Sequence, residues 1–484
     1  MENVFVEKVN EVYVRVNAEP STKMEMSSYF EFFVPGYKWM PAYRNKVWDG
    51  KVRLLNTMTG LIYYGLIPYI AKFCESRNYE LILDKELENI NEIPEEYGKM
   101  LAKEFDAAFE PREYQNRAVV HGLRHKRALL LSPTASGKSF IIYLIARYHN
   151  KHGRRVLTIV PTTSLVSQMA GDFLEYNKGR ELDIHKIMAG VDKNITADYT
   201  ITTWQSIYKQ RKPFFEKFDV VIIDEAHLAK AKSLTGIMEK TPNIEFRYGF
   251  TGTLDDTQTH KLVLEGLFGK VYQVTETKTL IEDNTLADFN IKSIVLGYPD
   301  GVRKLNKNKT YQEEIDWIVR NEARNKFIRN LAWSLPGNTL VLFQFVEKHG
   351  MVLEPMLQKE GKNVHFIHGG VSAEDRENVR TIAEASGDNI ILASYGTFST
   401  GVNIKRLDNV IFASPSKSKI RNLQSIGRVL RKGNGKDTAT LYDIVDDLQW
   451  KSKKNFAVQH FMERVKTYSS EGFEFKIYNV DIGG

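Results

Sequence analysis

A Gly-Lys-Ser triplet contains candidate phosphate-binding residues. It closes the segment Ser132–Ser139, which reads Ser-Pro-Thr-Ala-Ser-Gly-Lys-Ser between the apolar run Ala128–Leu131 and the helical pattern of Phe140–Tyr148. A strand, a loop and a helix in this order suit phosphate binding, because backbone N–H groups of the loop and of the helix N-terminus face the phosphates. Lys138 would neutralise phosphate charge, and the Ser139 hydroxyl would ligate Mg²⁺. Predicted nucleotide contacts are Pro133, Thr134, Ala135, Ser136, Gly137, Lys138 and Ser139.

An apolar run that ends in two carboxylates follows about 90 residues further on. Residues 218–227 read Phe-Asp-Val-Val-Ile-Ile-Asp-Glu-Ala-His. Asp224, at the end of the run, can hold the water shell of Mg²⁺, and Glu225 can orient or deprotonate an attacking water. Paired acids after a strand are usually a helix N-cap when they occur alone. Together with the upstream phosphate loop, they predict nucleotide hydrolysis.

A third motif, Gln424–Arg431, reads Gln-Ser-Ile-Gly-Arg-Val-Leu-Arg. Arg428 and Arg431 are three residues apart and would share one helix face. The alternative is a solvated basic face. An ATP site between two domains, however, needs an arginine that stabilises the transition state from across the cleft. We therefore predict that Arg431 is the main arginine that stabilises the transition state, and that Arg428 and Gln424 assist it.

From residue 111 onward, the predicted elements that carry these residues alternate between strands and helices. Continuous apolar runs indicate strands buried on both faces of parallel sheets: Ala128–Leu131, Val156–Val160, Val220–Ile223, Thr339–Phe343, Ile390–Ala393 and Val410–Ala413. Residues 1–70 show short alternating strands and a helical segment near 21–34. We expect an α/β protein with an N-terminal α+β domain (1–110), two motor domains (111–280 and 325–484) and a connector (281–324).

Charge is distributed unevenly along the 484 residues, whose net charge is +7. Residues 1–110 hold 13 basic and 18 acidic side chains, whereas the remainder holds 54 and 42. A basic excess weakly favours a polyanionic partner. The single cysteine, Cys74, excludes a disulfide framework and a cysteine-rich zinc site. With neither a secretory signal nor a run long enough to span a bilayer, we expect a cytoplasmic protein without a membrane partner.

The segment 33–55 interleaves aromatic and basic residues within the acidic N-terminal part. Its five cations, Lys38, Arg44, Lys46, Lys51 and Arg53, face one acid, Asp49, amid Tyr37, Trp39, Tyr43 and Trp48. Such a pattern suits nucleic acid, where rings stack on bases and cations meet phosphates. A small β core with its cations in solvent fits the pattern equally well. Trp48 and the five cations are the predicted nucleic-acid contacts.

The ordered motifs resemble those of the superfamily 2 helicases, which implies two RecA-like domains and ATP with Mg²⁺. Arg112 and Gln115 resemble the adenine-sensing Q motif, and Thr251-Gly252-Thr253 resembles motif III. Implied nucleic-acid contacts are Thr162, Trp204, Gln205, Thr400 and Gly401. Asn403 stands where many relatives have an Asp facing the nucleotide ribose, so the resemblance leaves its contact open.

The chain also resembles the UvsW-type recombination DNA helicases of large tailed phages, through Trp48–Leu55, Tyr311–Ile315, Ala393–Gly396 and Gln424–Arg431. The family implies an ATP-driven enzyme that regresses forks, migrates four-way junctions and unwinds D-loops and RNA–DNA hybrids. It also implies host cytoplasm as the location and recombination or single-strand-binding proteins as partners, and we expect a monomer.

Other functions explain less of the sequence. An RNA helicase shares the Asp-Glu-Ala-His spelling, and a double-stranded DNA translocase would use the same motor without strand separation. A P-loop kinase or GTPase leaves Gln424–Arg431 unexplained. A non-catalytic binding module does not account for the full set of ATP-site residues.

Overall fold

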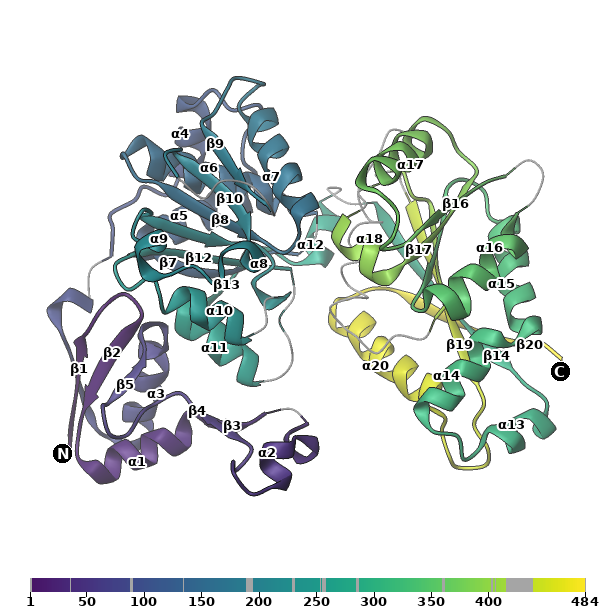
Figure 1. Ribbon diagram of the computed structural model, residues 1–484, viewed down its shortest axis with the longest axis horizontal. Coiled ribbons are helices and arrows are strands. Elements are labelled where there is room, and N and C mark those ends of the chain that lie inside the picture. Colours follow the sequence, from purple (N-terminus) through teal and green to yellow (C-terminus); the bar gives the residue numbers. More distant parts are fainter. Residues whose placement is uncertain are drawn as a thin grey trace. The chain divides into compact units, whose positions relative to one another are not determined.

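The computed structural model describes most of the chain. The described residues are 2–34, 36–87, 90–133, 135–188, 195–228, 231–252, 254, 258–283, 287–358, 362–401, 404, 406–414 and 438–483. They form two compact units, 1–132 with 137–274, and 133–136 with 275–484 (Figure 1). None of the helices in this part of the chain combines the length and apolar character that crossing a membrane requires.

The first unit begins with a small α+β domain built on a mixed sheet in the order β5-β2-β1-β6. Its strands are β1 (Asn3–Lys8), β2 (Tyr13–Asn17), β5 (Leu61–Tyr63) and β6 (Glu80–Leu83), and its long helices are α1 (Pro20–Tyr29) and α3 (Ile67–Arg77). Only the β1–β6 pair is parallel among these. Val4, Val6, Val14 and Val16 are buried because side chains alternate across a strand. This alternation confirms the short strands expected in residues 1–70.

A two-stranded hairpin projects from this domain. β3 (Glu31–Phe33) pairs with β4 (Lys51–Arg53), and the short helix α2 (Pro41–Arg44) lies between them. The helix expected near 21–34 is therefore shorter, because α1 ends at Tyr29 and the next residues pair as a strand. We call residues 31–53 the aromatic–basic hairpin.

The rest of the first unit is a seven-stranded sheet in the order β13-β7-β12-β11-β8-β10-β9, in which every pair is parallel. Its strands are β7 (Arg127–Leu131), β8 (Val156–Val160), β9 (Ile184–Ile187), β10 (Tyr199–Thr203), β11 (Val220–Ile223), β12 (Phe246–Thr251) and β13 (Val271–Gln273). The helices are α4 (Tyr97–Glu104), α5 (Glu113–His125), α6 (Lys138–Lys151), α7 (Thr163–Tyr176), α8 (Trp204–Ile207), α9 (Lys212–Phe215), α10 (Ala231–Met238) and α11 (Gln258–Phe268).

The second unit contains another seven-stranded parallel sheet, in the order β16-β17-β15-β18-β19-β14-β20. Its strands are β14 (Asp288–Gly297), β15 (Thr339–Phe343), β16 (Asn363–Ile367), β17 (Asn389–Ser394), β18 (Asn409–Phe412), β19 (Thr438–Asp447) and β20 (Phe475–Asp481). The helices are α12 (Thr277–Glu282), α13 (Asp300–Asn306), α14 (Tyr311–Arg320), α15 (Glu322–Ser334), α16 (Met351–Leu357), α17 (Ala373–Ala385), α18 (Tyr395–Gly401) and α20 (Phe456–Ser470).

Residues expected to form a connector, 281–324, contribute to this second sheet. β14 lies between β19 and β20, and α14 packs its Ile315, Ile318 and Val319 into the core of the unit. The segment alternates buried and exposed positions, so it lacks the continuous apolar run that marks the central strands. The two parallel sheets and the preceding α+β domain confirm the expected fold class.

Candidate ATP and nucleic-acid sites

The carboxyl ends of neighbouring strands gather the residues predicted to handle ATP. The phosphate loop follows β7, and Asp224 follows β11. Strand β12 lies between β7 and β11 and pairs with both. Leu131 is opposite Thr251, and Ile223 is opposite Gly249 and Ile159. Because parallel strands end at the same edge of a sheet, motifs far apart in sequence meet there.

The phosphate loop turns sharply between β7 and α6. Ala135 and Gly137 have φ of 68° and 78°, in the left-handed region that glycine adopts at no steric cost. Ser132 is buried and donates its backbone N–H to the Thr251 carbonyl oxygen at 2.8 Å. The Ser136 hydroxyl donates to the Pro133 carbonyl oxygen at 2.6 Å. The loop is therefore held from within and from β12.

Lys138 lies against both carboxylates of the acid pair. Its Nζ hydrogen-bonds Glu225 Oε1 and lies 3.8 Å from Asp224 Oδ1. Burial raises the pKa of the Asp224 carboxyl to about 6, an effect that the Lys138 ammonium opposes and the Glu225 carboxylate increases. The structure thus brings together the lysine and the two acids that the sequence predicts.

Glu225 is connected to the end of β12 through His227. His227 Nδ1 lies 3.4 Å from Glu225 Oε2 and 2.6 Å from Thr251 Oγ1. All three side chains are largely buried, and Glu225 itself has a φ of 49°. Our sequence reasoning assigned no function to His227. The apolar strand before Asp224 and the Thr-Gly-Thr triplet are the signals that would have pointed to this connection.

The predicted adenine-sensing residues lie beside the phosphate loop. Gln115 Oε1 accepts the Arg112 backbone N–H at 2.9 Å and so caps α5. The Gln115 amide also packs on Gly137, where an added Cβ would lie 2.4 Å from Gln115 Nε2. Tyr176, which the sequence did not single out, lies 2.7 Å from the Ser139 hydroxyl through its own hydroxyl.

Two predicted strand-contacting loops follow the adjacent strands β8 and β10. Thr162 Oγ1 accepts the Leu165 backbone N–H at 3.4 Å and begins α7. Gln205 is exposed and donates to the Pro161 carbonyl oxygen at 3.3 Å, which joins the two loops. Trp204 is only half-buried and packs against the core of the sheet. Gln205 is therefore the more accessible of the pair.

Several predicted residues of the second unit are described only in part. Thr400 and Gly401 lie in the last turn of α18, a helix that begins after the buried Ser394, whose hydroxyl donates to Thr397 at 2.8 Å. The predicted residues Thr134, Asn403, Gln424, Arg428 and Arg431 lie outside the described residues. The same is true of Thr253.

The aromatic–basic hairpin separates its five cations into two groups. Lys51 and Arg53 lie beside acids: Lys51 Nζ bonds Glu31, and Arg53 bonds Asp49 at 2.5 Å and Glu31 at 3.2 Å. The other three cations are exposed and have no acidic partner in the described part of the chain: Lys38, Arg44 and Lys46. The second group is the one available to an anion.

The aromatic rings of the hairpin also differ in their exposure to solvent. Tyr37 stacks on Phe33 at 4.6 Å and meets Tyr43 edge-on at 4.7 Å, between ring centroids. Trp48 is half-buried, and its indole N–H donates to the Lys51 carbonyl oxygen at 2.8 Å. Trp39, by contrast, is 83% exposed. Most rings of the segment therefore pack on one another, whereas Trp39 faces solvent, and contact with nucleic acid stays a prediction.

Two seven-stranded parallel sheets, with a phosphate loop and an Asp-Glu pair on the first, define the two-domain RecA-like motors of superfamily 2. Family models agree: "type III restriction enzyme, res subunit" matches residues 108–256, and "helicase conserved C-terminal domain" matches 323–433. A third model, "DNA helicase UvsW, N-terminal", matches residues 5–84.

The chain is 36% identical over 493 residues to the ATP-dependent DNA helicase uvsW of Enterobacteria phage T4, covering 97% of this chain and 98% of the relative. A crystal structure of T4 UvsW matches 99% of this chain and 100% of its own, at 33% identity and a TM-score of 0.53. The DNA 3'-5' translocase XPB2 of Sulfurisphaera tokodaii is 25% identical over 413 residues, covering 77% of this chain and 89% of the relative. The chain belongs to the UvsW family, and it is an ATP-dependent DNA helicase.

Proposed function

We propose that this helicase remodels branched DNA: it regresses forks, migrates Holliday junctions, and unwinds D-loops and R-loops in phage recombination, repair and replication. The observation that carries the proposal is the aromatic–basic hairpin. It presents an exposed tryptophan, Trp39, and three exposed cations that have no acidic partner among the described residues. The T4 relative, whose name gives it as an ATP-dependent DNA helicase, matches 97% of the chain, and the UvsW N-terminal model spans residues 5–84, which include the hairpin.

In this proposal, the hairpin engages the branch point. Trp39 stacks on an unpaired base, and Lys38, Arg44 and Lys46 meet backbone phosphates. Trp48 and the paired Lys51 and Arg53 contribute by holding the hairpin in shape. In the motor domains, strand contacts are Thr162, Trp204, Gln205, Thr400 and Gly401.

ATP hydrolysis is proposed to use the residues around Lys138. Its ammonium leaves Glu225 for the phosphates when ATP binds, and Glu225 is then free to orient and deprotonate the attacking water. Arg112 and Gln115 read the adenine. Arg428 and Arg431, with Gln424, stabilise the transition state, and Asn403 contacts the nucleotide.

The donor set also fits Mg²⁺. The ion prefers oxygen ligands, and the Ser139 hydroxyl with the Asp224 carboxylate provides them beside the phosphate loop. The buried Asp224 has a raised pKa, so a nearby cation would favour its ionised form. When bound, Mg²⁺ would neutralise charge that develops on the phosphates.

We further propose that the protein acts as a monomer divided into an accessory domain (1–110), two motor domains (111–280 and 325–484) and the segment between them (281–324). Recombination or single-strand-binding proteins would be its partners.

A side-by-side assay on labelled substrates tests the function. A fork, a four-way junction, a D-loop, an R-loop and an RNA duplex are each incubated with protein, ATP and Mg²⁺. We expect ATP-dependent product from the branched DNAs and the R-loop. Product from the RNA duplex alone would favour an RNA helicase. ATPase activity stimulated by duplex DNA, with no strand separated from any substrate, would favour a double-stranded DNA translocase.

A further inference from the structure

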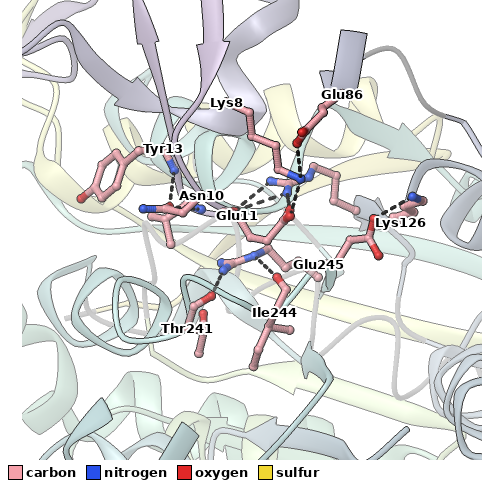
Figure 2. Close-up of polar contacts among 12 residues, drawn as sticks. Lys8, Asn10, Glu11, Tyr13, Glu86, Lys126, Thr241, Ile244 and Glu245 are labelled. Atoms are coloured by element: carbon pink, nitrogen blue, oxygen red, sulfur yellow. Dashed lines mark hydrogen bonds and ion pairs between the residues drawn. The ribbon is translucent and has the colours of Figure 1, made fainter. Parts of the chain in front are cut away.

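The N-terminal domain meets the first parallel sheet through the turn between β1 and β2 (Figure 2). At its tip, the Glu11 backbone N–H donates to the Pro242 carbonyl oxygen at 2.9 Å. The Glu11 carbonyl oxygen accepts from both terminal nitrogens of Arg127 at 3.3 Å, and Glu11 Oε2 lies 2.7 Å from Arg127 Nη2. Backbone and side chain of one residue therefore join the two domains.

The largely buried Glu11 carboxylate forms ion pairs with two cations, Arg127 and Lys8. Its other oxygen, Oε1, lies 2.7 Å from Lys8 Nζ, and the Glu11 and Arg127 side chains are only 12% and 9% exposed. Arg247 is fully buried nearby, where its guanidinium donates to the carbonyl oxygens of Ile244 and Thr241. Guanidinium groups stay charged in proteins, so removing a buried carboxylate leaves uncompensated positive charge.

The two arginines stand at the start of the strands that end in the ATP site. Arg127 opens β7 and is the register partner of Arg247 in β12; four residues further on, Leu131 is the partner of Thr251. The phosphate loop follows Leu131, and Thr251 bonds His227. At a rise of about 3.3 Å per residue, the Glu11 contact and the ATP residues are about 13 Å apart along the same two strands.

A second set of contacts joins the domain to Glu239, the residue that follows α10, and to α11. Tyr13 and Tyr63 donate their hydroxyls to Glu239 at 2.9 and 3.0 Å, and Tyr69 donates to Glu265 at 2.6 Å. Gly65 approaches α11 so closely that an added Cβ would lie 2.0 Å from the Glu265 carbonyl oxygen. The domain therefore contacts the motor domain in a second place, at α11 and at the end of α10.

We propose that Glu11 is a positioning residue for DNA unwinding, because it clamps the N-terminal domain to the strands that lead to the ATP site. The aromatic–basic hairpin then moves together with this part of the motor during each ATP cycle. This inference rests on the proposed contact between the hairpin and DNA. It predicts that weakening the clamp separates ATP hydrolysis from strand separation.

The test compares full-length wild type with Glu11→Gln, which keeps the shape and removes the charge. For Glu11→Gln we expect kcat and KM for ATP within about twofold of wild type, while base pairs opened per ATP on a labelled fork fall by about tenfold. Hydrogen exchange supplies a readout besides activity. The amides of Glu11 and Tyr64, bonded to Pro242 and Val12, should lose protection, whereas the Ser132 amide should keep it.

The matched control is Lys126→Gln. Lys126 Nζ pairs with Glu245 Oε1 at 2.6 Å, next to the cluster but within the motor domain (Figure 2). This variant should open as many base pairs per ATP as wild type. A loss equal to that of Glu11→Gln would assign the effect to the stability of the sheet and overturn the proposal.

A cross-linking experiment separates the loss of the clamp from a general loss of stability in Glu11→Gln. Tyr13→Cys and Glu239→Cys, added to Glu11→Gln, are joined by a short bifunctional thiol reagent, since these side chains meet across the same interface. The cross-link should restore most of the lost coupling. A Glu11→Gln protein that unwinds with wild-type yield per ATP, or that loses ATPase and unwinding in parallel, contradicts the clamp. A wild type that leaves the fork intact contradicts the proposed function itself.

Discussion

The ATP site and the aromatic–basic hairpin both concentrate charge, but they neutralise it in different ways. In the ATP site, Lys138 and Glu225 bond each other, and His227 continues the contacts to Thr251, all with little exposure. In the hairpin, two cations are paired and three face solvent. Buried interactions depend strongly on every partner, whereas exposed ones are weak and nearly additive. Substitutions in the ATP site should therefore influence one another strongly, whereas substitutions in the hairpin should have nearly additive effects.

The largest effect is expected at Glu225. Glu225→Gln removes the base that activates water and should lower DNA-stimulated ATPase by about 10²–10⁴-fold, and Lys138→Ala should do the same. Fork binding, measured by fluorescence anisotropy, should stay within about twofold. Glu245→Gln is the control, since this half-exposed carboxylate lies at the other end of β12. Undiminished phosphate release from Glu225→Gln would remove Glu225 from the mechanism.

Thr251→Val tests whether the contacts extend beyond the acid pair. The change keeps the shape but removes the hydroxyl that lies 2.6 Å from His227 Nδ1. We expect kcat to fall by about tenfold with KM for ATP unchanged, because His227 and then Glu225 lose their fixed positions. Thr200→Val is matched, since the Thr200 hydroxyl is buried with no hydrogen-bond partner in the described structure. An equal fall in kcat for both variants, measured by steady-state kinetics, would contradict the connection from Thr251 through His227 to Glu225.

Trp39 and Trp48 are expected to differ in their roles within the hairpin. Trp39→Ala should weaken fork binding by about tenfold, since stacking on one base is worth about 1–3 kcal/mol. Trp48→Ala should lower the melting temperature more than Trp39→Ala does, because it removes a half-buried ring and its bond to Lys51. Met58→Ala, at a 93% exposed position in another turn of the domain, should change neither. Stronger binding loss from Trp48→Ala, with an unchanged melting temperature, would reverse the assignment.

The smallest effects are expected at the three hairpin cations that have no acidic partner in the described part of the chain. Each of Lys38→Gln, Arg44→Gln and Lys46→Gln should weaken fork binding by about threefold and reduce the slope of log K against log salt by about 0.9. Lys51→Gln serves as the paired control, because Lys51 already bonds Glu31. Its salt slope should stay at the wild-type value. Identical slopes for all four variants would show that the paired and unpaired groups do not differ toward DNA.

The architecture of the motor and the order of its ATP-site motifs could be predicted from the amino-acid sequence. Runs such as Val156–Val160 and Val220–Ile223 have no polar face, so only strands covered on both sides accommodate them. Strands with polar or charged positions were harder to find. β12 contains the buried Arg247, and β14 alternates, so neither shows a continuous apolar run. The resemblance to UvsW-type helicases was also readable, because ordered motifs extend along nearly the whole chain.

Outside the ATP site, the polar contacts could be found only in the folded structure. Lys51 and Lys38 look alike in the sequence, and folding alone brings Glu31 to one of them. Glu11 and Arg127 are 116 residues apart, and no local sequence pattern predicts their contact. Periodic burial can be recognised from the pattern of apolar residues within one segment, whereas an ion pair between domains depends on how distant segments pack. For that reason, the sequence identified the ATP-driven motor, and the structure showed how the N-terminal domain is joined to it.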